Sequence, residues 1–95
     1  MIEIFTFTLR PGVDDERFIA VDGRVQTEFA YQQPGLARRT TGRNVQGRWL
    51  VLQLWSNDEA AAAARALFDA SELGAEFTSM IDPDSVHRED FAGTG

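Results

Sequence analysis

The segment at positions 48–68, RWLVLQLWSNDEAAAAARALF, constrains the fold of this 95-residue chain more than any other. Its first half predicts a strand, and because side chains alternate along a strand, three leucines share one face and two indoles the other. The leucines are residues 50, 52 and 54, and the indoles belong to Trp49 and Trp55. A sheet covered by helices on one side normally shows polar residues on the other. We interpret the tryptophan face as the uncovered one, which then faces another subunit or lines a pocket.

A helix is predicted directly after this strand. Ser56 and Glu59 form an S-x-x-E capping box, and Asp58 adds negative charge to the first turn. Five consecutive alanines begin at Ala60 and favour helix by intrinsic propensity. The segment therefore predicts a strand, a short connection and a helix.

The rest of the chain repeats this pattern of strand and helix. The remaining predicted elements are strands at 2–9, 36–41 and 85–91, a helix from Asp14 or Asp15 to about Gln32, and a short helical piece at 73–81. The order is β-α-β-β-α-β, which predicts an α+β, ferredoxin-like domain with a four-stranded antiparallel sheet covered by helices on one face. We expect a single domain at 1–91 and a flexible tail at 92–95.

Charge and length exclude several classes of partner. The formal net charge of −6 argues against non-specific binding of nucleic acid or of an anionic membrane, since both need clustered basic residues. No segment approaches the length of a membrane span. The N-terminal residues carry Glu3 where a signal peptide needs basic residues, so a cytoplasmic protein is predicted.

Missing residue types narrow the chemistry. The chain has no cysteine, which excludes thiol nucleophiles, disulfides and thiolate metal sites. All nine basic residues are arginine, which excludes Schiff-base lysine chemistry. His87 is the only histidine, so one subunit cannot form a histidine-rich metal site. We expect no metal and no cofactor.

Three local features carry a family resemblance that extends over residues 2–91. They are the strand end Arg10-Pro11-Gly12, the turn Pro34-Gly35, and the run LWSNDEA at 54–60. With them, the chain resembles the antibiotic biosynthesis monooxygenase-like domain of the dimeric α+β barrel superfamily. The resemblance implies a homodimer in which two open sheet faces pack together, with a ligand cavity in each subunit. It also implies a cofactor-independent monooxygenase of a small aromatic or polycyclic, quinol- or anthrone-like metabolite.

Haem degradation, another activity of this superfamily, is not expected. The haem-degrading members use an Asn on the first strand, together with a Trp and a His on or after the second helix. Here the first strand has no Asn, and no Trp or His lies between Ser56 and Asp84.

Aromatic residues are the candidates for binding a flat, apolar ligand. Trp55, and less so Trp49, could stack on such a ligand, although packing in a dimer interface explains both equally well. Phe5 and Phe7 take the inner positions of the first strand and are predicted to contribute to the same cavity.

Polar candidates for the chemistry are few. His87 is the one side chain whose ordinary pKa suits proton transfer near neutral pH, and it is the candidate general base if it points into the cavity rather than into solvent. Tyr31 could orient a substrate hydroxyl. The alternative is that its ring is buried and its own hydroxyl is exposed to solvent. Arg38 and Arg39 alternate across the second strand, so one of them should face the cavity and could clamp a carboxylate or phenolate. Arg38 is the candidate for this role, although alternation does not decide which of the two faces the cavity, and a surface ion pair is the alternative.

The missing catalytic constellation leaves a second function open. A non-catalytic homodimer that binds or senses a small ligand fits the same sequence. An RNA-binding domain of the same topology is disfavoured by the acidic balance and by the lack of a basic sheet with exposed aromatics.

Overall fold

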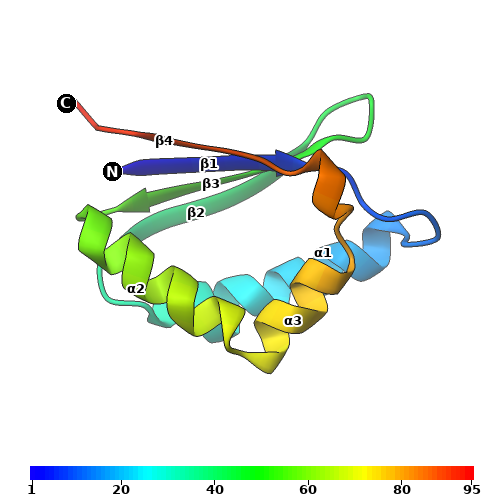
Figure 1. The fold of residues 1–95 in the computed structure, drawn as a ribbon, viewed down its shortest axis with the longest axis horizontal. Coiled ribbons are helices and arrows are strands. Elements are labelled where there is room, and N and C mark those ends of the chain that lie inside the picture. Colours follow the sequence, from blue (N-terminus) through cyan, green and yellow to red (C-terminus); the bar gives the residue numbers. More distant parts are fainter.

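The computed structural model describes all 95 residues and shows one sheet with every helix on the same side of it (Figure 1). The four-stranded antiparallel sheet has the strand order β2-β3-β1-β4. Its elements are β1 (Ile2–Phe7), α1 (Asp15–Arg24), β2 (Leu36–Arg43), β3 (Trp49–Trp55), α2 (Asp58–Asp69), α3 (Glu72–Ser79) and β4 (His87–Phe91). The predicted ferredoxin-like α+β fold is confirmed, with α2 and α3 together forming its second helical unit.

Side-chain caps fix where the helices begin. The carboxylate of Asp14 accepts a hydrogen bond from the backbone N–H of Arg17 at 2.7 Å, so Asp14 rather than Asp15 is the N-cap of α1. The N-cap of α2 is Asn57, whose side-chain oxygen accepts from the N–H of Ala60 at 2.8 Å. The expected Ser56 capping box is therefore wrong, because Asn57 already satisfies the N–H that a cap must satisfy.

The long helix predicted up to Gln32 changes character part-way. After α1, residues Val25–Phe29 form a π-helix and Ala30–Gln32 a 3-10 turn. A π-helix inserts extra backbone into a turn and is frequent at functional sites. Val25 and Ala30 are buried against the sheet side, so this irregular segment belongs to the interior wall of the helical layer.

The helices cover the tryptophan face of the sheet, which corrects the expectation that this face is open. Trp49 is 5 % exposed and Trp55 6 %, and Val51 between them is fully buried. Phe7, paired in register with Trp49, is also fully buried. Alternation separates the two faces of β3 but does not say which face the helices cover, because both faces are apolar.

Aromatic packing forms the centre of the core on this covered face. The rings of Phe18 and Trp49 lie 4.7 Å apart, and Phe18 also contacts Phe7 and Phe77 at centroid distances of 5.6 and 5.3 Å. Such offset and edge-to-face pairs stabilise a core beyond their buried area. The core therefore joins β1 and β3 to α1 and α3.

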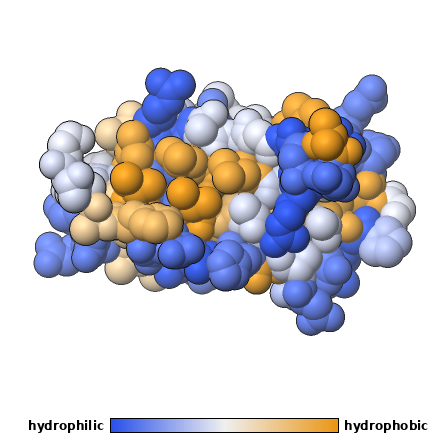
Figure 2. All heavy atoms as spheres, turned by 90° about the horizontal axis from the view of Figure 1, so that it is seen from above, coloured by the Kyte–Doolittle hydropathy of each residue, from blue (hydrophilic) through white to orange (hydrophobic).

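The opposite face of the sheet has no layer over it. Figure 2, viewed onto this face, shows a contiguous apolar area with polar groups around it. Register assigns to this face two isoleucines of β1, three leucines of β3 and one phenylalanine of β4, namely Ile2, Ile4, Leu50, Leu52, Leu54 and Phe91. We call these six residues the open apolar face. None of the helices is long and apolar enough to cross a membrane.

Candidate functional site

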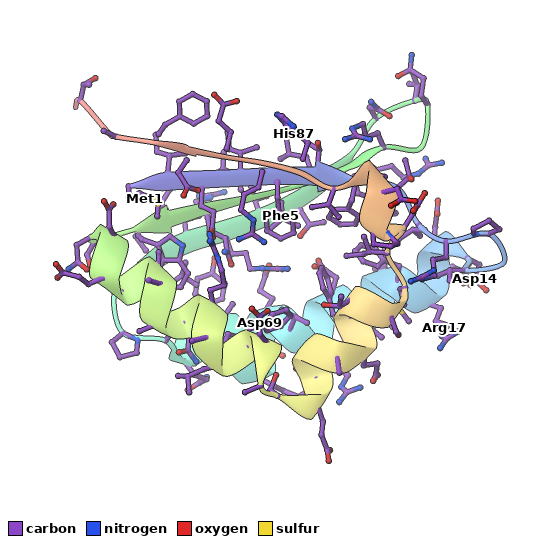
Figure 3. The ribbon with its side chains drawn as sticks, in the orientation of Figure 1. Met1, Phe5, Asp14, Arg17, Asp69 and His87 are labelled. Atoms are coloured by element: carbon purple, nitrogen blue, oxygen red, sulfur yellow. The ribbon has the colours of Figure 1, made fainter.

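A cavity of about 320 Å³ lies between the sheet and the helices. This volume is at the lower end of the range of small-molecule sites, roughly 300–1,000 Å³. Figure 3 shows Phe5 pointing from the sheet toward the helices and Asp69 at the helical side of the same space. The cavity therefore lies within one chain, between the two layers of the fold.

Aromatic rings contribute to the cavity wall on both its helical side and its sheet side. Phe29 and Phe68 contact each other at 5.1 Å, and Phe68 contacts Phe77 at 5.7 Å, so the three rings form a continuous surface on the helical side. Phe5 and Trp55 supply rings from the sheet. The π-helix contributes Phe29 directly to this wall, which places the irregular turn at the cavity. These walls fit a flat, apolar molecule.

Glu3 is the polar centre of the cavity. Its side chain leaves β1 on the covered face, and the residue is 3 % exposed. One carboxylate oxygen accepts hydrogen bonds from Gln53 Nε2 at 2.6 Å and from Trp55 Nε1 at 3.3 Å. The other accepts from the guanidinium groups of Arg65 and of Arg88, the latter at 3.3 Å. Three separate elements, β3, α2 and β4, thus supply donors to one buried carboxylate.

These donors decide the charge of Glu3. Burial by itself raises the pKa of its carboxyl, because an apolar environment disfavours the charged form. Hydrogen bonds from Arg65, Gln53 and Trp55, together with the positive charge of Arg65, outweigh this effect. The pKa of Glu3 therefore lies below its ordinary value, and the carboxylate is ionised at neutral pH.

A second buried ion pair closes the wall beside β2. Arg39, on the covered face of this edge strand, donates through Nη2 to the carboxylate of Asp22 in α1 at 2.7 Å. The arginine is almost fully buried. Its other terminal nitrogen, Nη1, lies 3.4 Å from the hydroxyl of Thr41. Asp22 thus neutralises Arg39, and the pair connects the helical layer to the edge of the sheet.

The cavity meets solvent between β4 and the two helices α2 and α3. The lining residues on that side are exposed and include Asp69, Thr78 and Val86. Arg65 reaches this opening from α2, and Arg88 reaches it from β4, where its guanidinium lies 5.1 Å from the ring centre of Phe5. We call this side of the cavity the mouth. Both arginines at the mouth form ion pairs with Glu3.

The predicted ring-binding residues are divided between the cavity and the core. Phe5, Phe7 and Trp55 line the cavity. Trp49 does not, because it packs on Phe18 deeper in the core. Its place in substrate binding stays a prediction without a contact to support it.

The predicted polar residues lie outside the cavity. Arg38 points to the open side of the sheet, so Arg39 is the member of this pair that lines the cavity. His87 is exposed and points away from the helices (Figure 3). The hydroxyl of Tyr31 donates to the carbonyl of Arg39 at 3.1 Å and accepts from its N–H at 2.9 Å, which uses that hydroxyl to close the edge of β2. The proton-transfer role of His87 and the orienting role of Tyr31 stay predictions.

Sequence reasoning missed Glu3, Arg65, Arg88 and Asp69. Glu3 carried a usable signal, because it shares a strand face with Phe5 and Phe7, and a carboxylate on a buried face needs partners. Arg65 was a second signal, because it is the one charged residue that follows directly on the five alanines of the predicted helix. No group of three or more histidine, aspartate or glutamate side chains lies close enough together to hold a metal ion.

Comparison with solved structures identifies proteins that have a similar fold. SnoaB from Streptomyces nogalater, a cofactor-independent oxygenase, superimposes with a TM-score of 0.82 over 99 % of this chain and 92 % of its own, at 18 % identity. A proposed antibiotic biosynthesis monooxygenase from Chloroflexus aurantiacus J-10-fl gives 0.70 over 99 % and 95 %, at 17 % identity. The chain has the fold of the antibiotic biosynthesis monooxygenases. At these identities the likeness concerns the fold, and it confirms the resemblance expected from the sequence at that level.

The same fold also occurs in a protein from Arabidopsis thaliana, At3g17210, with a TM-score of 0.75 over 99 % of this chain and 95 % of its own, at 17 % identity. No protein-family model matches the sequence, and no curated protein matches it.

Proposed function

We propose that the protein is a cofactor-independent monooxygenase that oxidises a small aromatic or polycyclic, quinol- or anthrone-like metabolite in the cavity beneath the sheet. The observation that carries the proposal is a largely apolar cavity of about 320 Å³ with aromatic rings on two sides, in a fold shared with SnoaB, a cofactor-independent oxygenase. In such a reaction the substrate itself reduces dioxygen. In an anthrone, the activated CH₂ group becomes a carbonyl. In a quinol, a ring C–H becomes C–OH and the ring is oxidised to a quinone. In both reactions one atom of dioxygen enters the product and the other leaves as water.

The cavity residues have two tasks in this reaction. The rings of Phe5, Phe68 and Phe77 hold the substrate's ring system and exclude water. Reaction with dioxygen is fastest from an electron-rich, deprotonated substrate, and the guanidinium groups of Arg65 and Arg88 stabilise the negative charge that deprotonation creates.

Asp69 is our candidate for the group that removes the proton. It lines the cavity at the end of α2 and makes no ion pair. Glu3 is the other carboxylate of the lining, but two guanidinium groups, Gln53 and Trp55 already occupy its oxygens. A carboxylate held ionised by that many donors is a poor proton acceptor.

We also propose that the protein works as a homodimer joined through the open apolar face. The six residues of this face lie on three adjacent strands, on the side of the sheet that the helices do not cover. Large contiguous apolar areas are uncommon on monomers and mark interaction sites. A two-fold axis parallel to the sheet and lying above β1 and β3 would place the open apolar faces of two copies against each other, since an isologous interface uses the same surface twice.

Oxygen uptake with a panel of anthrones and quinols tests the activity. We expect dioxygen consumption equal to the amount of carbonyl product, without added metal, flavin or haem. Asp69→Asn should lower turnover on the order of 100-fold, as removal of a general base does. The matched control is Asp84→Asn, which changes an exposed carboxylate outside the cavity lining and should turn over like the wild type. A panel without any enzyme-dependent uptake would refute the oxygenase.

A non-catalytic homodimer that binds or senses a small ligand is the second candidate function. It is favoured by the placement of His87 and Tyr31, neither of which lines the cavity. Such a protein would bind the same aromatic compounds, and binding would be unchanged by oxygen. Tight binding of a panel compound with no product formed under air is the result that selects this function over the oxygenase.

A further inference from the structure

The charge of the cavity lining is opposite to the charge of the whole chain. The protein has a formal net charge of −6. The lining nevertheless holds four arginines and two carboxylates, which are Arg10, Arg39, Arg65, Arg88, Glu3 and Asp69. Even when Asp22, outside the lining, is set against Arg39, one positive charge is left over. A concave apolar site with an excess of positive charge attracts an anion.

At the mouth, neither guanidinium group has a carboxylate to itself. Glu3 is the shared ion-pair partner of Arg65 and Arg88, and one carboxylate cannot neutralise two guanidinium groups. Glu3 also holds these two side chains in place from opposite sides, since Arg65 belongs to α2 and Arg88 to β4. Asp69 lies at the same mouth but makes no ion pair with either arginine, so an anion bound between the two guanidinium groups would be their second partner.

Arg65 also has a hydrogen-bond donor to spare. Its Nε is buried and has no partner, the one such side-chain atom in the structure. Buried polar groups in proteins are almost always hydrogen-bonded, so an unpartnered donor in a cavity wall needs an explanation. Arg88 contacts Glu3 only at 3.3 Å, which leaves most of its five N–H donors free as well. Protein atoms close off Nε of Arg65, so the oxygen atoms of a bound molecule would accept instead from the partly exposed guanidinium groups of Arg65 and Arg88.

We propose that the cavity selects an aromatic anion, with its ionised oxygen held by Arg65 and Arg88 at the mouth and its ring among the phenylalanines inside. The ionised oxygen is that of a carboxylate or of a phenolate, since guanidinium binds both. This inference rests on the proposed function because it concerns the same cavity. It adds the charge of the ligand and the two arginines that recognise that charge.

Calorimetric titration of the wild-type protein with 2-naphthoate and with 2-naphthamide tests the carboxylate. The two compounds have the same ring and nearly the same shape, and they differ in charge. We expect 2-naphthoate to bind at least about tenfold more tightly, the gain typical of a hydrogen bond to a charged group.

The phenolate is tested by a spectrophotometric pH titration of 2-naphthol with the protein in excess. A bound phenolate beside two guanidinium groups should ionise at least about one pH unit below free naphthol. A shift without a preference for naphthoate assigns a phenolate as the ionised oxygen, and the reverse pattern assigns a carboxylate. Either result supports the anion site.

Two variants and a control test whether the arginines at the mouth cause the preference for naphthoate. Arg65→Gln and Arg88→Gln should each reduce the preference for naphthoate over naphthamide to within about twofold. Arg17→Gln removes an exposed arginine near Asp14, outside the cavity lining, and should keep the full preference (Figure 3). Both mouth arginines are partly exposed, and Arg88→Gln provides the test if Arg65→Gln does not fold.

The proposal is overturned if wild-type protein binds naphthoate and naphthamide equally and leaves the naphthol titration unshifted. Absence of binding by all three compounds at millimolar concentration overturns it too. These results are separate from turnover: a charge preference without oxygen uptake keeps the anion site and removes the oxygenase. Oxygen uptake without a charge preference does the opposite.

Discussion

The two faces of the sheet are formed by the same four strands, yet they differ in the side chains they carry and in what covers those side chains. The covered face combines aromatic rings with two buried charged residues, Glu3 and Arg39. The open apolar face carries mainly aliphatic side chains that are half-buried by their neighbours. Charges are tolerated on the covered face because the helices bring partners, Arg65 for Glu3 and Asp22 for Arg39. The other face has no layer to supply partners, and its apolar side chains need a second surface.

The sharpest way to break this comparison is to remove one large side chain from each face. Phe7→Ala deletes a fully buried ring between three other rings and should lower the free energy of unfolding by about 3–5 kcal/mol. Ile4→Ala, on the open apolar face, should cost about 1 kcal/mol at concentrations where the chain is monomeric. Urea unfolding measures both. Equal losses would mean that the two faces are equally buried within one chain.

A charge placed on the open apolar face tests whether a partner covers it. Leu52 pairs with Ile4 and Thr40 near the middle of this face. Leu52→Glu should weaken the dimer at least about 100-fold, because an unpaired carboxylate cannot be buried in an apolar interface. Sedimentation velocity should show a dimer for the wild type and a monomer for the variant. Val45→Glu, at a hairpin position that is 94 % exposed, is the control and should stay dimeric. A wild-type chain that sediments as a monomer at micromolar concentration would contradict the interface.

Acid should weaken the covered face through Glu3. The folded state lowers the pKa of this carboxyl below its ordinary value of 4.5. Its contribution to stability is therefore present above pH 4.5 and is lost as the pH falls through the folded pKa. Glu3→Gln should reduce stability at pH 7 by about 1–3 kcal/mol and flatten the dependence of stability on pH below 4.5. Urea unfolding at pH 7 and pH 3 measures this, with the exposed Glu16→Gln as control. An unchanged acid dependence in Glu3→Gln would assign the effect to other carboxyls.

The smallest expected effect concerns Tyr31. Its hydroxyl pairs with the backbone N–H and carbonyl of Arg39 at the free edge of β2. Tyr31→Phe should cost about 1 kcal/mol of stability, the usual value of such a hydrogen bond, and leave turnover and ligand affinity unchanged. Denaturation and activity measured on the same preparation separate the two effects. A large loss of turnover at unchanged stability would return Tyr31 to the catalytic role that its sequence context suggests.

Local patterns were sufficient to predict the elements, and tertiary contacts were needed for the site. Alternation in residues 2–9 and the alanine-rich segment predicted β1 and α2 because strand and helix periods are properties of neighbouring residues. The same patterns did not predict the π-helix at Val25–Phe29 or the N-cap at Asn57. The π-helix depends on how the backbone packs against other elements, whereas the Asn57 cap is a local contact for which Ser56 was the competing candidate. Arg65 and Arg88 are 23 residues apart in the chain, and only the fold brings them to one carboxylate.

The sequence alone determined that this chain forms a ferredoxin-like α+β sheet with two apolar faces, because side-chain period and turn residues act over a few positions. Which face receives the helices was decided by the tertiary structure, since the indole and leucine faces of β3 differ little in hydrophobicity and differ greatly in volume. The helices pack on the aromatic side, where large rings leave irregular space. That space, with Glu3 and its arginines at one end, is the cavity on which the proposed chemistry depends.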